Sequence, residues 1–142
     1  MKRKLRAFTL IELLVVILIL GVLAALIVPR VVGRGDEAKR AKAASDISTL
    51  SGLLQQFYID TGRFPTTEEG LSALRTPPSD VRNWQGPYTT KPIPLDPWEN
   101  EYIYEFPGPS GEPNTFLLMS LGSDGAPGGE GSAADIIDGE EG

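Results

Sequence analysis

The stretch RAFTLIELLVVILILGVLAALIVPR, residues 6–30, decides how the rest of the chain is arranged. It contains no charged residue from Leu13 to Val28, and with residues 8–11 it approaches the roughly 20 residues that cross a hydrocarbon core as a helix. Basic residues precede the apolar run at positions 2, 3, 4 and 6. This pattern predicts a membrane span whose N-terminus stays in the cytoplasm, so that everything after Pro29 lies outside.

A cleaved secretory signal shares the basic start and is the main alternative. That interpretation expects a shorter apolar run and an A-x-A type cleavage site after it. Here the run is long and continues into a helical pattern. The sequence therefore favours an anchor that is retained.

Composition excludes several classes of function. The chain has 142 residues, enough for one modest domain, and contains neither cysteine nor histidine. A Ser-His-Asp arrangement, thiolate chemistry and most zinc sites are therefore excluded. Four of the 13 basic residues precede the apolar run, so the remainder carries nine basic against 19 acidic residues, a net charge of −10. Such an acidic chain is not expected to bind nucleic acid.

A second helical pattern follows the apolar run. We expect an amphipathic helix over residues 36–61, with Asp36 capping its start and Gly62 and Pro65 ending it. The connecting PRVVGRG, residues 29–35, predicts a kink or melting point, and hence one long, interrupted helix. Apolar residues recur at three- and four-residue intervals on one face: Ile47, Leu50, Leu54 and Phe57.

The rest of the chain predicts a small head. Thr66 and Glu69 have the spacing of a capping box, which indicates a brief helix. Residues 77–98 are rich in proline and predict an ordered loop, whereas 101–106 and 114–121 predict an antiparallel hairpin. The predicted fold class is α+β, with a long N-terminal α-helix, a transmembrane half plus an amphipathic half, packed on a small antiparallel β-sheet.

The C-terminal tail LGSDGAPGGEGSAADI, residues 121–136, is rich in glycine and acidic. Asp124 and Asp135 stand near its two ends, and the glycines between them permit a tight path that brings the carboxylates together with backbone carbonyls. Hard oxygen donors of this kind suit calcium, although the spacing is not that of an EF-hand. A solvated acidic loop is the alternative. For the separate cluster of Asp96, Glu99 and Glu101, we expect a solvated face rather than a second cation site.

Several motifs together resemble a known family. FTLIELLVVILILGVLAALIVP, residues 8–29, is similar to the N-terminal segment of type IV pilins and pseudopilins. FPTTEEGLSAL, GPY, DPW and the tail from Leu121 to Ile136 resemble the major pseudopilin of type II secretion, the general secretion pathway protein G family. The resemblance covers nearly the whole chain, with its motifs in the right order.

This resemblance implies processing at the start of the chain. A prepilin peptidase would cut between Ala7 and Phe8 and methylate the new Phe8 amine. Family members usually have glycine before the cut, and Ala7 departs from that pattern. Because alanine has the next smallest side chain, we expect equal or slower processing.

The resemblance also implies a calcium site in the tail. The ion would be held by the side chains of Asp124 and Asp135, by the Leu121 carbonyl and by a carbonyl near Ser132 or Ala133. The tail departs from the family after Ile136, where relatives often continue with Gly-Asn-Trp and this chain has IDGEEG.

Glu12 gains a role from the processing that the resemblance implies. A free Phe8 amine, in the same subunit or in a neighbour, would neutralise this carboxylate in a low-dielectric setting. Pairing with a neighbour's amine would set the register of assembly. The alternative is that Glu12 lies near the cytoplasmic interface and snorkels into the headgroups.

The function implied is that of a structural subunit rather than an enzyme. We expect a cleaved leader over 1–7, a hydrophobic filament-core helix over 8–30 and a periplasmic head over 31–142. The subunit would leave the inner membrane to polymerise into a periplasmic pseudopilus that helps drive folded proteins through the outer membrane. Expected partners are further copies of the chain, minor pseudopilins, the prepilin peptidase, the inner-membrane assembly platform, the outer-membrane secretin and, before assembly, membrane lipid.

Two alternatives remain. A minor or adhesive type IV pilin-like subunit would have the same anchor but a binding head, which would usually be larger. A monomeric anchored binding module or enzyme would leave Glu12 and the FTLIE start without a purpose.

Overall fold

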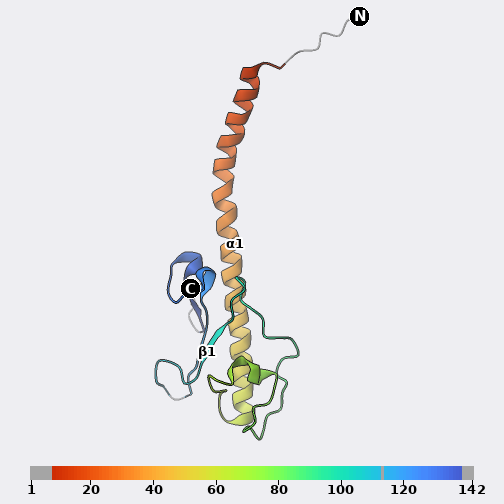
Figure 1. The fold of residues 1–142 in the computed structure, drawn as a ribbon, viewed down its shortest axis with the longest axis vertical. Helices are drawn as coiled ribbons and strands as arrows, with labels where there is room; N and C mark the ends of the chain where they lie inside the picture. The colour runs from red at the N-terminus through yellow and green to blue at the C-terminus, as the bar shows by residue number, and fades with distance from the viewer. Residues whose placement is uncertain (1–7, 113, 139–142) are drawn as a thin grey trace, which may run out of the picture. The chain divides into compact units, whose positions relative to one another are not determined.

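The computed structural model describes residues 8–112 and 114–138, and all of their side chains except those of 24–34. The predicted leader, 1–7, and the end of the tail, 139–142, therefore lie outside the described residues. The chain divides into two compact units, Met1–Asp36 and Glu37–Gly142. Helix α1 (Leu10–Thr61) contributes residues to both (Figure 1).

In the first unit the described apolar side chains are exposed. Phe8 is 84% and Leu10 82% exposed, and Leu23 is still 50% exposed. Among the residues whose side chains the structure describes, which omit 24–34 of the apolar run, no helical stretch is long and apolar enough to cross a membrane.

The predicted interruption of the helix at residues 29–35 was wrong, because α1 continues through them. Pro29 removes a single backbone donor, at a cost of about 3 kcal/mol in a helix interior, and this one loss does not end the helix. Asp36, predicted as the cap of a second helix, consequently lies inside α1. The predicted end was right: Gly62 follows Thr61 with a φ of 80°, and its N–H donates to the Tyr58 carbonyl over 2.8 Å.

The second unit is built on the apolar face of α1 that the periodicity predicted. The four predicted residues are at most 3% exposed. They share a core with residues of the sheet and of the 3₁₀ helix η1 (Gly70–Leu74). This face is where the helix contacts the rest of the head; its members are Ala43, Ile47, Leu50, Leu54 and Phe57.

The sheet has three short antiparallel strands in the order β1-β2-β3. The predicted hairpin is confirmed: β1 (Ile103–Glu105) pairs with β2 (Leu117–Ser120), with Tyr104 opposite Leu118. The third strand, β3 (Ile136–Ile137), was not predicted, because two residues are too few to show an alternating pattern. It pairs with the far end of β2, so that Ser120 lies opposite Ile136.

The capping box after α1 is confirmed. The Thr66 N–H donates to Glu69 Oε2 over 2.8 Å, and the Glu69 N–H donates to Thr66 Oγ1 over 3.2 Å. The brief helix it introduces is η1. Residues 77–98 form the predicted loop without helix or strand.

Candidate functional site

Glu12 lies in the first turn of α1 and completes a second capping box. Its Oε2 accepts from both the N–H and the Oγ1 of Thr9, each over 2.9 Å, and the Glu12 N–H donates to Thr9 Oγ1 over 3.3 Å. This role was not predicted from the sequence, although the Thr-x-x-Glu spacing was the signal for it. Glu12 therefore has a local partner within one subunit. The predicted cleavage position, Ala7, lies outside the described residues, and Phe8 is almost fully exposed.

The glycine-rich tail folds into a closed loop made of two 3₁₀ turns that contact each other, η2 (Gly122–Asp124) and η3 (Gly131–Ala133). Gly122 and Gly129 have positive φ angles of 66° and 87°. A Cβ atom would lie 2.8 Å from the Ala133 carbonyl oxygen if it were added at Gly122, and 2.5 Å from it if added at Gly129. Only glycine therefore permits the backbone to close so tightly around this oxygen.

The two predicted carboxylates lie in this loop in different settings. Asp124 is exposed, and its Oδ1 accepts from the Ala126 N–H over 3.2 Å. Asp135 Oδ2 accepts from the Gly128 N–H over 2.9 Å. Asp135 Oδ1, in contrast, is buried and has no hydrogen-bond partner among the described residues. A buried carboxylate oxygen without a partner is costly, so this atom is a candidate ligand for a cation.

The donor set of the loop fits a hard cation. Among the described residues, no three histidine, cysteine, aspartate or glutamate side chains gather closely enough to hold a metal by themselves. A cation here would therefore need backbone carbonyls, and those of Leu121, Ser132 and Ala133 belong to the same pair of turns. Carboxylate and carbonyl oxygens are the ligands that calcium prefers.

Hydrogen bonds join the C-terminal loop and the end of β3 to α1, to β2 and to the segment before β1. Asn100 Nδ2 donates to the Gly122 carbonyl over 3.3 Å. At the end of β3, the Asp138 N–H donates to the Leu118 carbonyl over 2.9 Å, and Asp138 Oδ2 accepts from Ser51 Oγ of α1 over 2.8 Å. These contacts join residues far apart in the sequence, so no local pattern indicated them.

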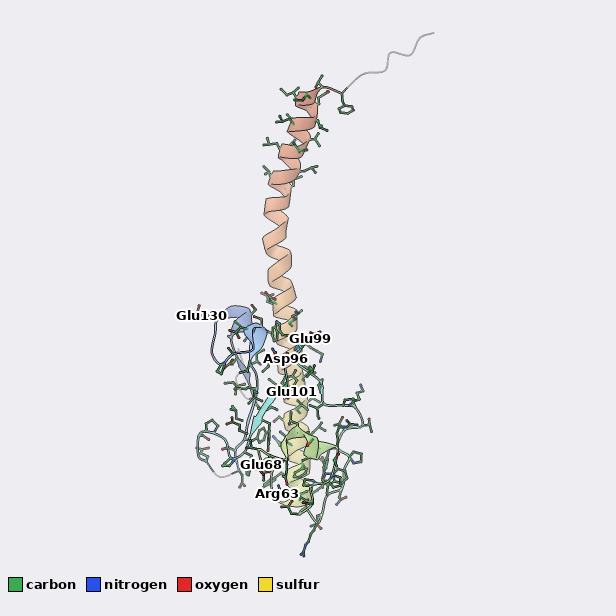
Figure 2. The ribbon with its side chains drawn as sticks, viewed as in Figure 1. Arg63, Glu68, Asp96, Glu99, Glu101 and Glu130 are labelled. Carbon is green, nitrogen blue, oxygen red and sulfur yellow. The ribbon has the colours of Figure 1, made fainter. Side chains whose placement is uncertain are left out.

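The acidic cluster around Asp96 differs in part from the prediction (Figure 2). Glu99 and Glu101 are exposed, as expected of a solvated face. Asp96 is instead only 4% exposed. Its carboxylate accepts from Ser120 Oγ over 2.6 Å and from the N–H groups of Trp98 and Asn100 over 3.0 Å and 2.8 Å. The Asp96 carboxylate therefore holds the turn of residues 96–100 against β2, and its role is structural.

A second carboxylate network, partly exposed to solvent, stabilises the turn after α1. Arg63 donates to both oxygens of Glu69 over 2.7 Å, and also to Asp80 Oδ1 over 3.0 Å. The hydrogen bonds from Arg63 hold the pKa of the Glu69 carboxyl below its ordinary value. Like Asp96, Glu69 has a structural role. The candidate functional features are therefore the exposed apolar start of α1 and the C-terminal loop.

Comparison with models of known protein families shows which family the chain belongs to. A family model described as type II secretion system (T2SS), protein G matches residues 30–139, and a prokaryotic N-terminal methylation motif matches residues 2–28. The chain belongs to the type II secretion system protein G family. The resemblance drawn from the sequence motifs is confirmed.

Individual relatives agree with this assignment. The type II secretion system core protein G of Vibrio cholerae is 43% identical over 136 residues, which cover 94% of this chain and 91% of the relative. That of Pseudomonas aeruginosa is 43% identical over 138 residues, 95% of each chain. Among solved structures, the major pseudopilin from the type 2 secretion system of enterohaemorrhagic Escherichia coli is 34% identical. Its TM-score is 0.63, and the match covers 75% of this chain and 91% of that chain.

Proposed function

We propose that this chain is the polymerising subunit of a type II secretion pseudopilus and acts mechanically rather than as a catalyst. The observation that carries this proposal is the exposed surface at the start of α1. Most of the described apolar side chains from Leu10 to Leu23 are at least half exposed to solvent. Such a surface needs a covering of lipid or of other apolar helices. Membership of a family that includes a major pseudopilin supports packing against further copies.

The route to the filament begins in the inner membrane. Residues 8–30 serve as a single-pass anchor, with the head of residues 31–142 in the periplasm; the basic residues before the apolar run support this orientation. A prepilin peptidase removes residues 1–7 by cutting between Ala7 and Phe8, and methylates Phe8. The match to the N-terminal methylation motif over residues 2–28 supports this step. The subunit then meets the assembly platform, minor pseudopilins and the outer-membrane secretin.

Glu12 sets the register between subunits. Among the described residues, its carboxylate accepts hydrogen bonds only from Thr9, whose N–H and hydroxyl are neutral donors. The amine exposed by cleavage is positively charged, and an ion pair surrounded by apolar helices is stronger than one in water. A neighbour's Phe8 amine would therefore attract Glu12 into one position along the filament axis.

Calcium holds the C-terminal loop of the head. Asp124, Asp135 and the carbonyls of Leu121 and of Ser132 or Ala133 would hold the ion, which supplies a positive charge that cross-links the two turns. The buried Oδ1 of Asp135, which has no hydrogen-bond partner among the described residues, supports this assignment. By joining η2 to η3, the ion would also keep β3 in place at the edge of the sheet.

A variant of Glu12 tests the assembly proposal. Glu12→Leu should leave membrane insertion intact but abolish filaments and secretion when it replaces the subunit in a host with a working secretion system. Glu37→Leu, which removes an exposed acid from α1 in the second unit, is the matched control and should assemble. Normal filaments from the Glu12→Leu chain, seen by electron microscopy of sheared cells, would refute the register argument.

A further inference from the structure

Arg40 of α1 reaches across to the C-terminal loop. Its Nη1 donates to two backbone carbonyls of the loop, that of Gly131 over 3.0 Å and that of Ala134 over 2.6 Å. Arg40 belongs to the second unit and is only partly exposed. These hydrogen bonds join positions more than 90 residues apart in the chain.

The two acceptors bracket the residues that would bind the cation. Ser132 and Ala133, whose carbonyls are the candidate ligands from η3, lie between Gly131 and Ala134. One nitrogen therefore fixes both ends of a two-residue segment. The close approach of Gly122 and Gly129 to the Ala133 carbonyl oxygen leaves this segment little room to shift.

We propose that Arg40 is a positioning residue for the cation in the C-terminal loop. It orders η3 before the ion arrives, so that the carbonyls of Ser132 and Ala133 are already in place and binding does not have to order them. This inference rests on the proposed calcium site. Fixing a flexible backbone segment opposes binding through lost conformational entropy, and residues that orient metal ligands without touching the metal commonly control its affinity.

The charge of Arg40 has the opposite effect on calcium affinity. The direction in which the Kd changes when Arg40 is replaced therefore shows which of the two effects is larger. A guanidinium repels a cation, so removal of the charge alone would tighten binding. Screening weakens this repulsion: Arg40 and Asp135 line a cavity of about 370 Å³ together with Glu37, enough space for several water molecules. The Asp135 carboxylate in the same lining offsets the charge further. We therefore expect the ordering effect to dominate.

Calcium titration of the full chain in a nonionic detergent, followed by isothermal calorimetry, tests the proposal. Arg40→Met should raise the Kd for calcium roughly tenfold or more, the usual effect of losing a residue that orients metal ligands. Arg40→Lys, which keeps a donor on a shorter side chain, should bind with intermediate affinity. Lys39→Met removes the same charge from an exposed neighbouring position and should change the Kd less than twofold.

Thermal melting separates positioning from a merely structural role. If Arg40 only stabilised the fold, Arg40→Met would lower the melting temperature equally in chelator and in calcium. The proposal requires the rise in melting temperature caused by calcium to shrink in this variant. If Arg40→Met does not fold in detergent, the same comparison is made with Arg40→Lys.

Three results would overturn the inference. An unchanged or lower Kd for calcium in Arg40→Met, with clear binding by the unsubstituted chain, would refute the positioning role of Arg40 but leave the proposed metal site standing. An undiminished calcium effect on melting in Arg40→Met would do the same. Absence of calcium binding by the unsubstituted chain would refute the proposed metal site and this inference with it.

Discussion

Asp135 gives the sharpest prediction about the C-terminal loop. One of its carboxylate oxygens accepts from the Gly128 N–H, and the other is buried without a partner among the described residues. Asp135→Asn keeps an oxygen for the Gly128 N–H but removes the negative charge. The variant should therefore lose calcium binding while leaving the loop intact in the absence of the ion.

The size of the effect follows from linkage. At a calcium concentration about 100 times its Kd, binding stabilises the folded head by about 2.7 kcal/mol. For a unit of about 100 residues this free energy raises the melting temperature by about 10–20 °C. In chelator the unsubstituted head carries a buried carboxylate oxygen with no partner, which opposes folding by about 1–3 kcal/mol. The Asp135→Asn chain should then melt at the same temperature as the unsubstituted chain or slightly higher.

Circular dichroism melting in chelator and in excess calcium measures both effects. Glu130→Gln is the matched control, because Glu130 is an exposed acid of the same loop (Figure 2) and should keep the full response to calcium. A gain of stability from calcium in the Asp135→Asn chain would refute the role of Asp135 as a calcium ligand. An equal drop in the melting temperature of this variant in chelator and in calcium would also refute it, because Asp135 would then be a structural residue.

Two further predictions concern the head. Leu54→Ala should lower the free energy of unfolding, measured by urea denaturation, by about 2–5 kcal/mol, because Leu54 is fully buried. Ile59 lies on the same helix but is 74% exposed, so Ile59→Ala should change this free energy by less than about 0.5 kcal/mol. Equal effects would contradict the assignment of the buried face. Glu69→Gln should cost about 1 kcal/mol at pH 7 through its weakened pairing with Arg63. Because the folded state lowers the pKa of Glu69 from its ordinary value of 4.5, this difference should persist above about pH 5 and vanish as the pH falls through the lowered pKa; a difference that stays constant down to pH 2 would contradict it.

The features predicted correctly from the sequence depend on neighbouring residues. The buried face of α1 repeats every three or four residues, the Thr66 capping box spans four residues, and β1 and β2 are separated by a turn-rich segment. Each follows from a local rule of helix or strand geometry. The same kind of rule would have found the capping box between Thr9 and Glu12, had it been applied to the start of the apolar run.

The features that the sequence did not predict depend on distant partners. Asp96 looked like one of three exposed acids, but its burial depends on Ser120 of β2, 24 residues away. β3 exists because the loop brings Ile136 back to the edge of β2. Arg40 looked like one of several basic residues on α1, and only the folded loop places two carbonyls within its reach.

The intact mass of the chain, recovered from membranes of a host that makes a prepilin peptidase, tests the pseudopilin account most directly. We expect loss of Met1–Ala7 and the addition of one methyl group to Phe8. An uncleaved chain, or one cut after the apolar run, would contradict the account. Such a chain would lack the free amine that is expected to pair with Glu12 in a filament.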